Sequence, residues 1–124
     1  MSWQPWVTDV TVTGADGGRR GPGSANHCMH GRQAVIEEIL DWRPYDYVTD
    51  RTVIETPHGA LKFTHTIEFE PITEGTTVHI RYALPRARQQ REHSAEVAAH
   101  YGDAVRSALP ALIEQLEARN SAAE

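Results

Sequence analysis

Apolar and polar residues alternate along residues 61–69, whose sequence is LKFTHTIEF. Successive side chains of a strand point to opposite faces, so this alternation predicts a strand with one buried face. After a turn that ends at Gly75, residues 78–84 alternate in the same way, and the two strands are predicted to form a hairpin. Other extended segments are expected at residues 10–13, from the Gly-Pro-Gly of 21–23 through Cys28, and at 47–55.

Residues 35–42, with the sequence VIEEILDW, do not follow this alternation. Their apolar positions fall at i, i+1, i+4 and i+5, which is the spacing of a helix face. The eight residues are bounded by Gly31 and Pro44 and would make a marginal helix, while their β-branched content also fits a strand that carries a bulge. The residues alone leave both interpretations open.

Residues 87–119 have the periodicity of one long amphipathic helix. Apolar residues recur there at spacings of three and four, namely Val97, Tyr101, Val105, Leu109, Leu112 and Leu116. Pro110 lies inside this pattern and lacks an N–H, so the helix is predicted to kink there. Strands within residues 7–85 followed by one helix predict an α+β fold, in which the helix covers one face of an antiparallel sheet.

The composition is that of a single globular domain over residues 1–124, with 40% hydrophobic residues and a net charge of -5. An acidic chain without a basic stripe argues against nucleic-acid binding. No apolar run approaches the roughly 20 residues of a membrane helix, and the N-terminus has no signal-peptide pattern. We therefore expect a cytoplasmic protein without membrane insertion, in which the single cysteine, Cys28, is reduced.

Three segments carry a resemblance to a known family: GSANHCMHG at 23–31, VIEEILDWRP at 35–44 and IEFEPITEGT at 67–76. They resemble the SRPBCC superfamily, the START-like, polyketide-cyclase-related helix-grip proteins, and the first two are typical of one bacterial subgroup. The resemblance spans nearly the whole chain. It implies that residues 35–42 are a strand. It also implies a curved antiparallel sheet of about six strands that grips the C-terminal helix and leaves an elongated apolar cavity.

Typical members of that superfamily begin with a strand and two short helices, and nothing before Trp3 could encode them. The chain therefore looks like the family without its first third. An unpaired sheet edge and an uncovered apolar patch favour association. We accordingly expect a homodimer or a larger assembly, in which elements could be exchanged between copies.

The predicted function is binding of a hydrophobic or aromatic small molecule between the sheet and the helix, without a cofactor. Strand alternation places His65 on the same face as Phe63, where burial would lower its pKa and the imidazole would orient a ligand or act as a general base. A core histidine paired locally is the alternative, and a buried Tyr82 has the same two interpretations. The candidate lining residues are Trp42, Phe63, His65, Tyr82, Tyr101 and Val105.

Two functions of other classes stay open. One is an enzyme resembling polyketide cyclases or aromatases, in which the cavity positions a reactive chain and His65 moves a proton. The other is a protein-interaction module that uses the exposed sheet edge. We expect binding rather than catalysis.

Three other groups of residues are not expected to form a functional site. A metal site at His27, Cys28 and His30 is not expected, because a strand points His27 away from the other two. The glycines between residues 14 and 23 fit a hairpin loop better than a phosphate-binding loop. The carboxylates Glu37, Glu38 and Asp41 are expected to be solvated surface charges.

Overall fold

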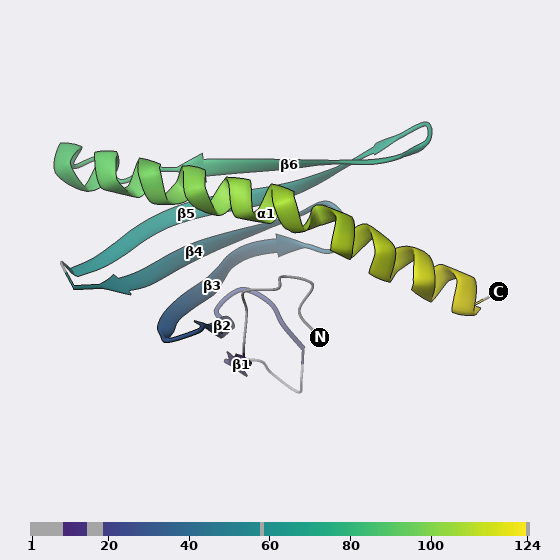
Figure 1. Cartoon of the computed structure of the whole chain (residues 1–124), viewed down its shortest axis with the longest axis horizontal. Helices are drawn as coiled ribbons and strands as arrows, with labels where there is room; N and C mark the ends of the chain where they lie inside the picture. The colour runs from purple at the N-terminus through teal and green to yellow at the C-terminus, as the bar shows by residue number, and fades with distance from the viewer. Residues whose placement is uncertain (1–8, 15–18, 58, 124) are drawn as a thin grey trace.

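The computed structural model describes residues 9–14, 19–57 and 59–123, which form one antiparallel sheet and one long helix (Figure 1). The strands follow one another across the six-stranded sheet in chain order. The α+β helix-grip prediction is confirmed, whereas most of the turn predicted at 14–18 lies outside the described residues. The elements are β1 (Asp9–Thr13), β2 (Ala25–His30), β3 (Gln33–Arg43), β4 (Tyr47–Thr56), β5 (Gly59–Ile72), β6 (Gly75–Ala83) and α1 (Arg88–Ala123).

Residues 35–42, for which the sequence left two interpretations open, belong to strand β3. The pairing of β3 with β4 is irregular at one point. The register between β3 and β4 shifts between Ile39, which faces Asp50, and Asp41, which faces Thr49. The extra residue, Leu40, lets the chain return to the same face one position late. The apolar spacing resembles that of a helix because Glu37 stands between Val35 and Ile39 on the inward face, Ile36 lies on the outer face, and the bulge adds Leu40 after Ile39. The prediction of a strand is confirmed.

A row of apolar side chains crosses the face of the sheet that is turned toward α1. Cys28 of β2 lies opposite Val35, Val35 opposite Ile54, and Ile54 opposite Leu61 of β5. These four residues and Phe63 form the buried core cluster. Each apolar side chain buried in this way contributes about 1.5 to 3 kcal/mol. Small or compact residues of α1 pack against the sheet: Ser94, Ala98, Val105 and Ala108.

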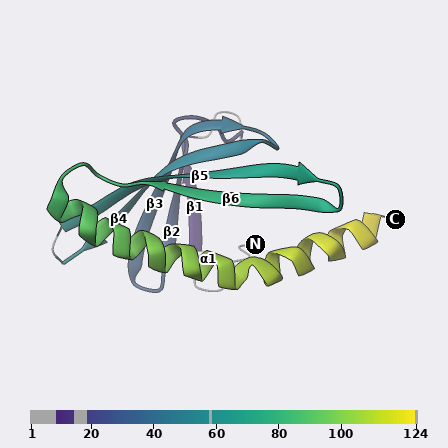
Figure 2. The ribbon, with the colours of Figure 1, turned by 90° about the horizontal axis from the view of Figure 1, so that it is seen from above.

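The long helix is continuous through Pro110 and changes direction part-way along its length (Figure 2). Its N-terminal half runs along β5 and β6, whereas its C-terminal half diverges from the hairpin that these strands form (Figure 1). Ile113 and Leu116 beyond the bend are 52% and 49% exposed. The bend is the one predicted from proline, and it leaves the far end of the sheet uncovered by α1.

Gly14 follows β1 with a φ of 70°, in the left-handed region, and a Cβ there would lie 2.8 Å from the carbonyl oxygen of Gly23. We expect Gly14→Ala to lower the free energy of unfolding by about 2 kcal/mol or more, because strain and a backbone clash add. Gly31→Ala is the matched control, since Gly31 has a φ of 66° and open space around it. Urea unfolding should give about half that loss for the control. Equal losses would show that the contact with Gly23 is unimportant.

Candidate functional site

The strand register brings polar side chains together on the face beneath α1. Glu37 of β3 lies opposite Thr52 of β4, and Asp50 of β4 lies opposite His65 of β5. His65 in turn lies opposite Tyr82 of β6. Alternation puts all of these residues on the side that also carries the apolar row. A polar cluster therefore lies next to the core, where unpaired polar groups are destabilising.

His65 is the centre of this cluster and is 2% exposed. Its Nδ1 atom lies 3.3 Å from the hydroxyl of Thr52, and its Nε2 atom lies 3.4 Å from a carboxylate oxygen of Asp50. Burial lowers the pKa of His65 to about 4. Burial, with the negative charge of Glu37 as a smaller cause, raises the pKa of Asp50 to about 7. The interior therefore favours the uncharged form of both partners.

Glu37 joins the helix to this cluster. The Tyr101 hydroxyl donates a hydrogen bond of 3.2 Å to one carboxylate oxygen, and the Cys28 thiol lies 3.9 Å from the other. The expectation that Glu37 is a solvated surface charge is wrong, because alternation with Val35 and Ile39 puts it on the inward face. Glu38 points to the opposite face and pairs with Arg51, as expected. Burial and then Glu37 raise the pKa of Cys28 to about 11, which keeps the thiol protonated and a poor nucleophile.

Four aromatic rings pack together between the sheet and the helix. The ring centroids of Phe63, His65, Tyr82 and Tyr101 lie 5.9 to 6.2 Å apart in the contacting pairs. The Tyr82 hydroxyl is buried and has no hydrogen-bond partner in the described part of the chain. It lies under Gly102, where a Cβ would be 3.2 Å from the phenol oxygen. The absence of a side chain at Gly102 thus lets α1 approach the ring.

A cavity lies on each side of this aromatic cluster. The first, named the Tyr101 cavity, has a volume of about 480 Å³ and lies beneath the N-terminal half of α1. Its lining includes Val35, Ile54, Leu61, Val97, Tyr101 and Ala104. The second, named the Trp42 cavity, has a volume of about 880 Å³. Its lining is Arg20, Asn26, Ile39, Trp42, Pro44, Tyr45, Val48, Asp50, Phe69, Pro71 and Thr76.

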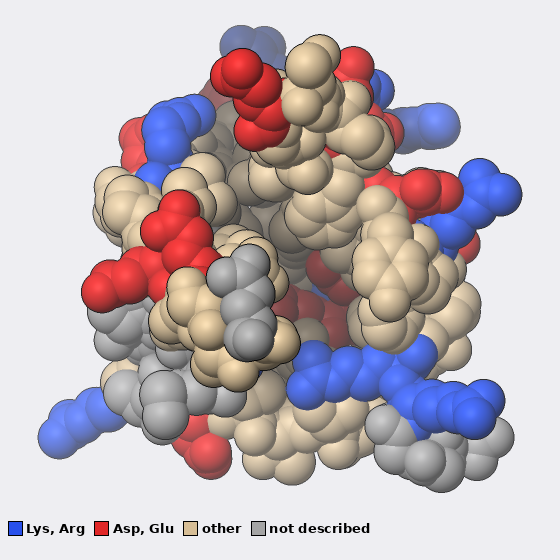
Figure 3. All heavy atoms as spheres, turned by 90° about the vertical axis from the view of Figure 1, so that its right-hand side faces the viewer, with Lys and Arg blue, Asp and Glu red and all other residues tan. Residues whose placement is uncertain are grey.

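The end of the molecule beyond the helix bend is hollowed (Figure 3). Uncharged side chains surround much of this hollow, acidic side chains are visible at its depth, and a basic side chain extends along its lower edge. The lining of the Trp42 cavity has the same character, with Asp50 only 8% exposed and Arg20 exposed. The cavity therefore joins an apolar entrance to a buried carboxyl group.

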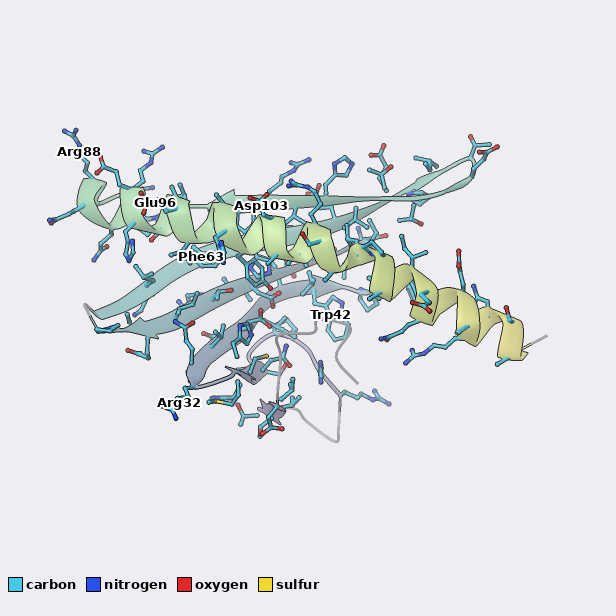
Figure 4. All side chains as sticks on the ribbon, in the orientation of Figure 1. Arg32, Trp42, Phe63, Arg88, Glu96 and Asp103 are labelled. Atoms are coloured by element: carbon cyan, nitrogen blue, oxygen red, sulfur yellow. The ribbon has the colours of Figure 1, made fainter. Side chains whose placement is uncertain are left out.

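The six residues predicted to line one cavity are divided by the structure. Trp42 is 37% exposed and lines the Trp42 cavity, whereas Tyr101 lines the cavity that bears its name. Phe63 and Val105 are buried in the core, and His65 and Tyr82 lie in the aromatic cluster between the cavities. Figure 4 shows Phe63 beneath α1 and Trp42 farther toward the bent half of the helix.

Sequence reasoning missed three polar members of the site, namely Asn26, Asp50 and Thr52. The segment YVTDRTVIE places Asp50 and Thr52 in register with Val48 and Ile54, but polar residues occupy both faces of this strand. Only the pairing with β5 shows which face is buried. Pairing residues 47–55 with the clearly alternating strand at 61–69 would have identified the buried face of the former.

A family model described as polyketide cyclase / dehydrase and lipid transport matches residues 1–118. The chain belongs to this polyketide cyclase / dehydrase and lipid transport family. The resemblance to the SRPBCC superfamily is confirmed, and the family description agrees with a role in binding hydrophobic ligands. Searches of the curated proteins and of the solved structures gave no match.

Two further findings concern what this family member contains. Within residues 9–14, 19–57 and 59–123, no helix combines the length and the apolar character needed to cross a membrane. The same ranges hold no group of three or more His, Cys, Asp or Glu side chains arranged to bind a metal ion. The homodimer stays a prediction, because the structure describes one chain.

Proposed function

We propose that the protein binds a hydrophobic small molecule in the Trp42 cavity, with the polar end of the ligand directed toward Asp50. The observation that carries this proposal is a cavity with aromatic walls and one buried carboxyl group at its inner end. The walls include Trp42, Tyr45 and Phe69. Its volume of about 880 Å³ lies within the range usual for small-molecule sites.

The position of the cavity supports the same proposal. Figure 4 shows Trp42 beside the half of α1 that lies beyond the bend, and large apolar side chains of the cavity wall are exposed. Trp42, Tyr45 and Phe69 are 37%, 94% and 40% exposed. Burial of such surface by an apolar ligand is favourable by roughly 25 cal/mol per Å². Three exposed aromatic side chains in the wall of one cavity are typical of a ligand site rather than of an ordinary surface.

Titration with a polycyclic aromatic compound tests the proposal. We expect saturable binding by calorimetry, and Trp42→Ala should weaken it about tenfold or more because a large contact surface is lost. Ala104→Phe is the matched control, since Ala104 lines the Tyr101 cavity and the larger side chain would fill it. This control should bind like the wild type. Loss of binding in Ala104→Phe with no effect of Trp42→Ala would place the ligand in the other cavity.

The second candidate function is an enzyme resembling polyketide cyclases, and the Asp50–His65 pair favours it. The carboxyl group lines the Trp42 cavity and its oxygen lies 3.4 Å from the imidazole, so a proton could pass between a bound ligand and His65 by way of Asp50. Such a reaction would be lost in His65→Gln while ligand binding is retained. Binding without turnover of any polyketide or aromatic analogue would favour the first candidate.

A further inference from the structure

We propose that the ligand of the Trp42 cavity ends in a hydrogen-bond donor, a hydroxyl or an ammonium group. Hydrophobic molecules that end in a carboxylate are excluded from the cavity. This inference rests on the function proposed above and names the class of ligand. It follows from two side chains of the cavity wall, namely the buried carboxyl group of Asp50 and the amide of Asn26, whose oxygen has no partner among the described residues.

Two side chains of the cavity wall offer acceptor oxygens. Asp50 presents its carboxyl group there, and Asn26 of β2 contributes an amide. The Oδ1 atom of Asn26 is buried and has no hydrogen-bond partner among the described residues. A buried acceptor without a partner is destabilising by about 1 to 3 kcal/mol, and a donor on a bound ligand would remove that penalty.

Negative charge behind the cavity wall also favours a donor or a cation over a carboxylate on the ligand. Glu37 lies opposite Asn26 and opposite Thr52, and its negative charge is felt at Asp50. A ligand carboxylate at this wall would therefore lie close to two acidic side chains, Asp50 in the lining and Glu37 behind it. Like charges in such surroundings repel strongly, whereas an ammonium group would be attracted. The aromatic walls also suit a cation.

Arg20 is the basic residue in this lining and is the competing feature. Its side chain is exposed, and water and salt screen an exposed charge far more than a buried one. Asp50, in contrast, is 8% exposed. The acceptors at depth should therefore outweigh Arg20 in the choice of ligand.

Four naphthalene derivatives with one ring system separate these effects: 2-naphthylmethanol, 2-naphthylmethylamine, 2-naphthoate and 2-methylnaphthalene. We expect the alcohol and the amine to bind the wild-type protein about tenfold or more tightly than the carboxylate at pH 8, as measured by calorimetry. Asn26→Leu should weaken binding of the alcohol by several-fold and leave 2-methylnaphthalene unchanged. Asp50→Asn should reduce the difference in binding affinity between the carboxylate and the alcohol. Arg20→Gln should leave the order of the four affinities unchanged.

The failures of the two proposals differ. If the carboxylate binds as tightly as the alcohol, or if its binding depends on Arg20, the donor inference is overturned while the cavity keeps its proposed function. If none of the four compounds binds, 2-methylnaphthalene included, the proposed function is overturned and the donor inference with it. Thermal unfolding of each variant shows whether a loss of binding reflects a loss of the fold.

Discussion

Phe63→Ala is expected to lower the free energy of unfolding by about 3 to 5 kcal/mol, the range usual for truncating a buried phenylalanine. Phe63 is 2% exposed and belongs to the core cluster with Val35 and Leu61. Its ring also contacts the rings of Tyr82 and Tyr101, which join β6 and α1 to the core. Its removal would leave a cavity at the point where the sheet and the helix meet.

The other phenylalanine of the chain is a matched control. Phe69 lies six residues further along β5, and thus on the same face of the strand, but it is 40% exposed and lines the Trp42 cavity. Phe69→Ala should lower the free energy of unfolding by less than about 1 kcal/mol and should weaken ligand binding several-fold. Urea unfolding and calorimetry measure the two effects. Equal losses of stability would contradict the division into core and cavity wall.

The elements could be predicted from the sequence because each has a strong local pattern. The alternation of residues 61–69 and the spacing from Val97 to Leu116 are visible without tertiary information. Residues 35–42 were ambiguous for a physical reason, since a polar residue, Glu37, occupies an inward position and the extra residue at the bulge breaks the two-residue period after Ile39. The family resemblance resolved that ambiguity where periodicity could not.

The candidate site was less predictable because it depends on which strand lies opposite which. His65 could be assigned to the buried face from its own strand, but Asp50 and Glu37 could not, since their strands mix polar and apolar residues on both faces. Nor does the helical pattern say where α1 leaves the sheet. That separation puts Trp42 and Tyr101 in different cavities, although the sequence suggested one.

The buried pair of Asp50 and His65 should make stability depend on pH in two opposite ways. The pKa of Asp50 is raised from 3.8 to about 7, so its contribution to stability is largest below pH 4 and is lost as the pH rises through 7. The pKa of His65 is lowered from 6.5 to about 4, so its contribution is present above pH 6.5 and is lost as the pH falls through 4. Between pH 4 and 6.5 the loss of the Asp50 contribution and the gain of the His65 contribution largely cancel as the pH rises.

Two substitutions should separate these contributions, roughly 4 kcal/mol for Asp50 and roughly 3 kcal/mol for His65 as upper limits. The stability of Asp50→Asn, measured relative to the wild type, should increase from pH 4 to 7, because the variant lacks a carboxylate that is unfavourable when ionised. The stability of His65→Gln, measured in the same way, should decrease from pH 4 to 6.5, because the variant lacks the neutral imidazole's advantage. Urea unfolding across pH 4 to 8 gives both differences, and charges elsewhere cancel in the comparison.

The change of each difference between pH 4 and 6.5 decides between two electrostatic states of the pair. If Asp50 and His65 instead formed an ion pair, the carboxyl pKa would be lowered below 3.8 and the imidazole pKa raised above 6.5. The Asp50→Asn difference would then not rise and the His65→Gln difference would not fall between pH 4 and 6.5, because the lowered pKa acts at lower pH and the raised pKa at higher pH. Burial beside Glu37 argues for the uncharged state, because a second carboxylate in the same space is unfavourable. An uncharged pair just below neutral pH also keeps a proton at the inner end of the Trp42 cavity. That proton is what the candidate enzyme would need, so the pH series tests the stability of the fold and a requirement of catalysis together.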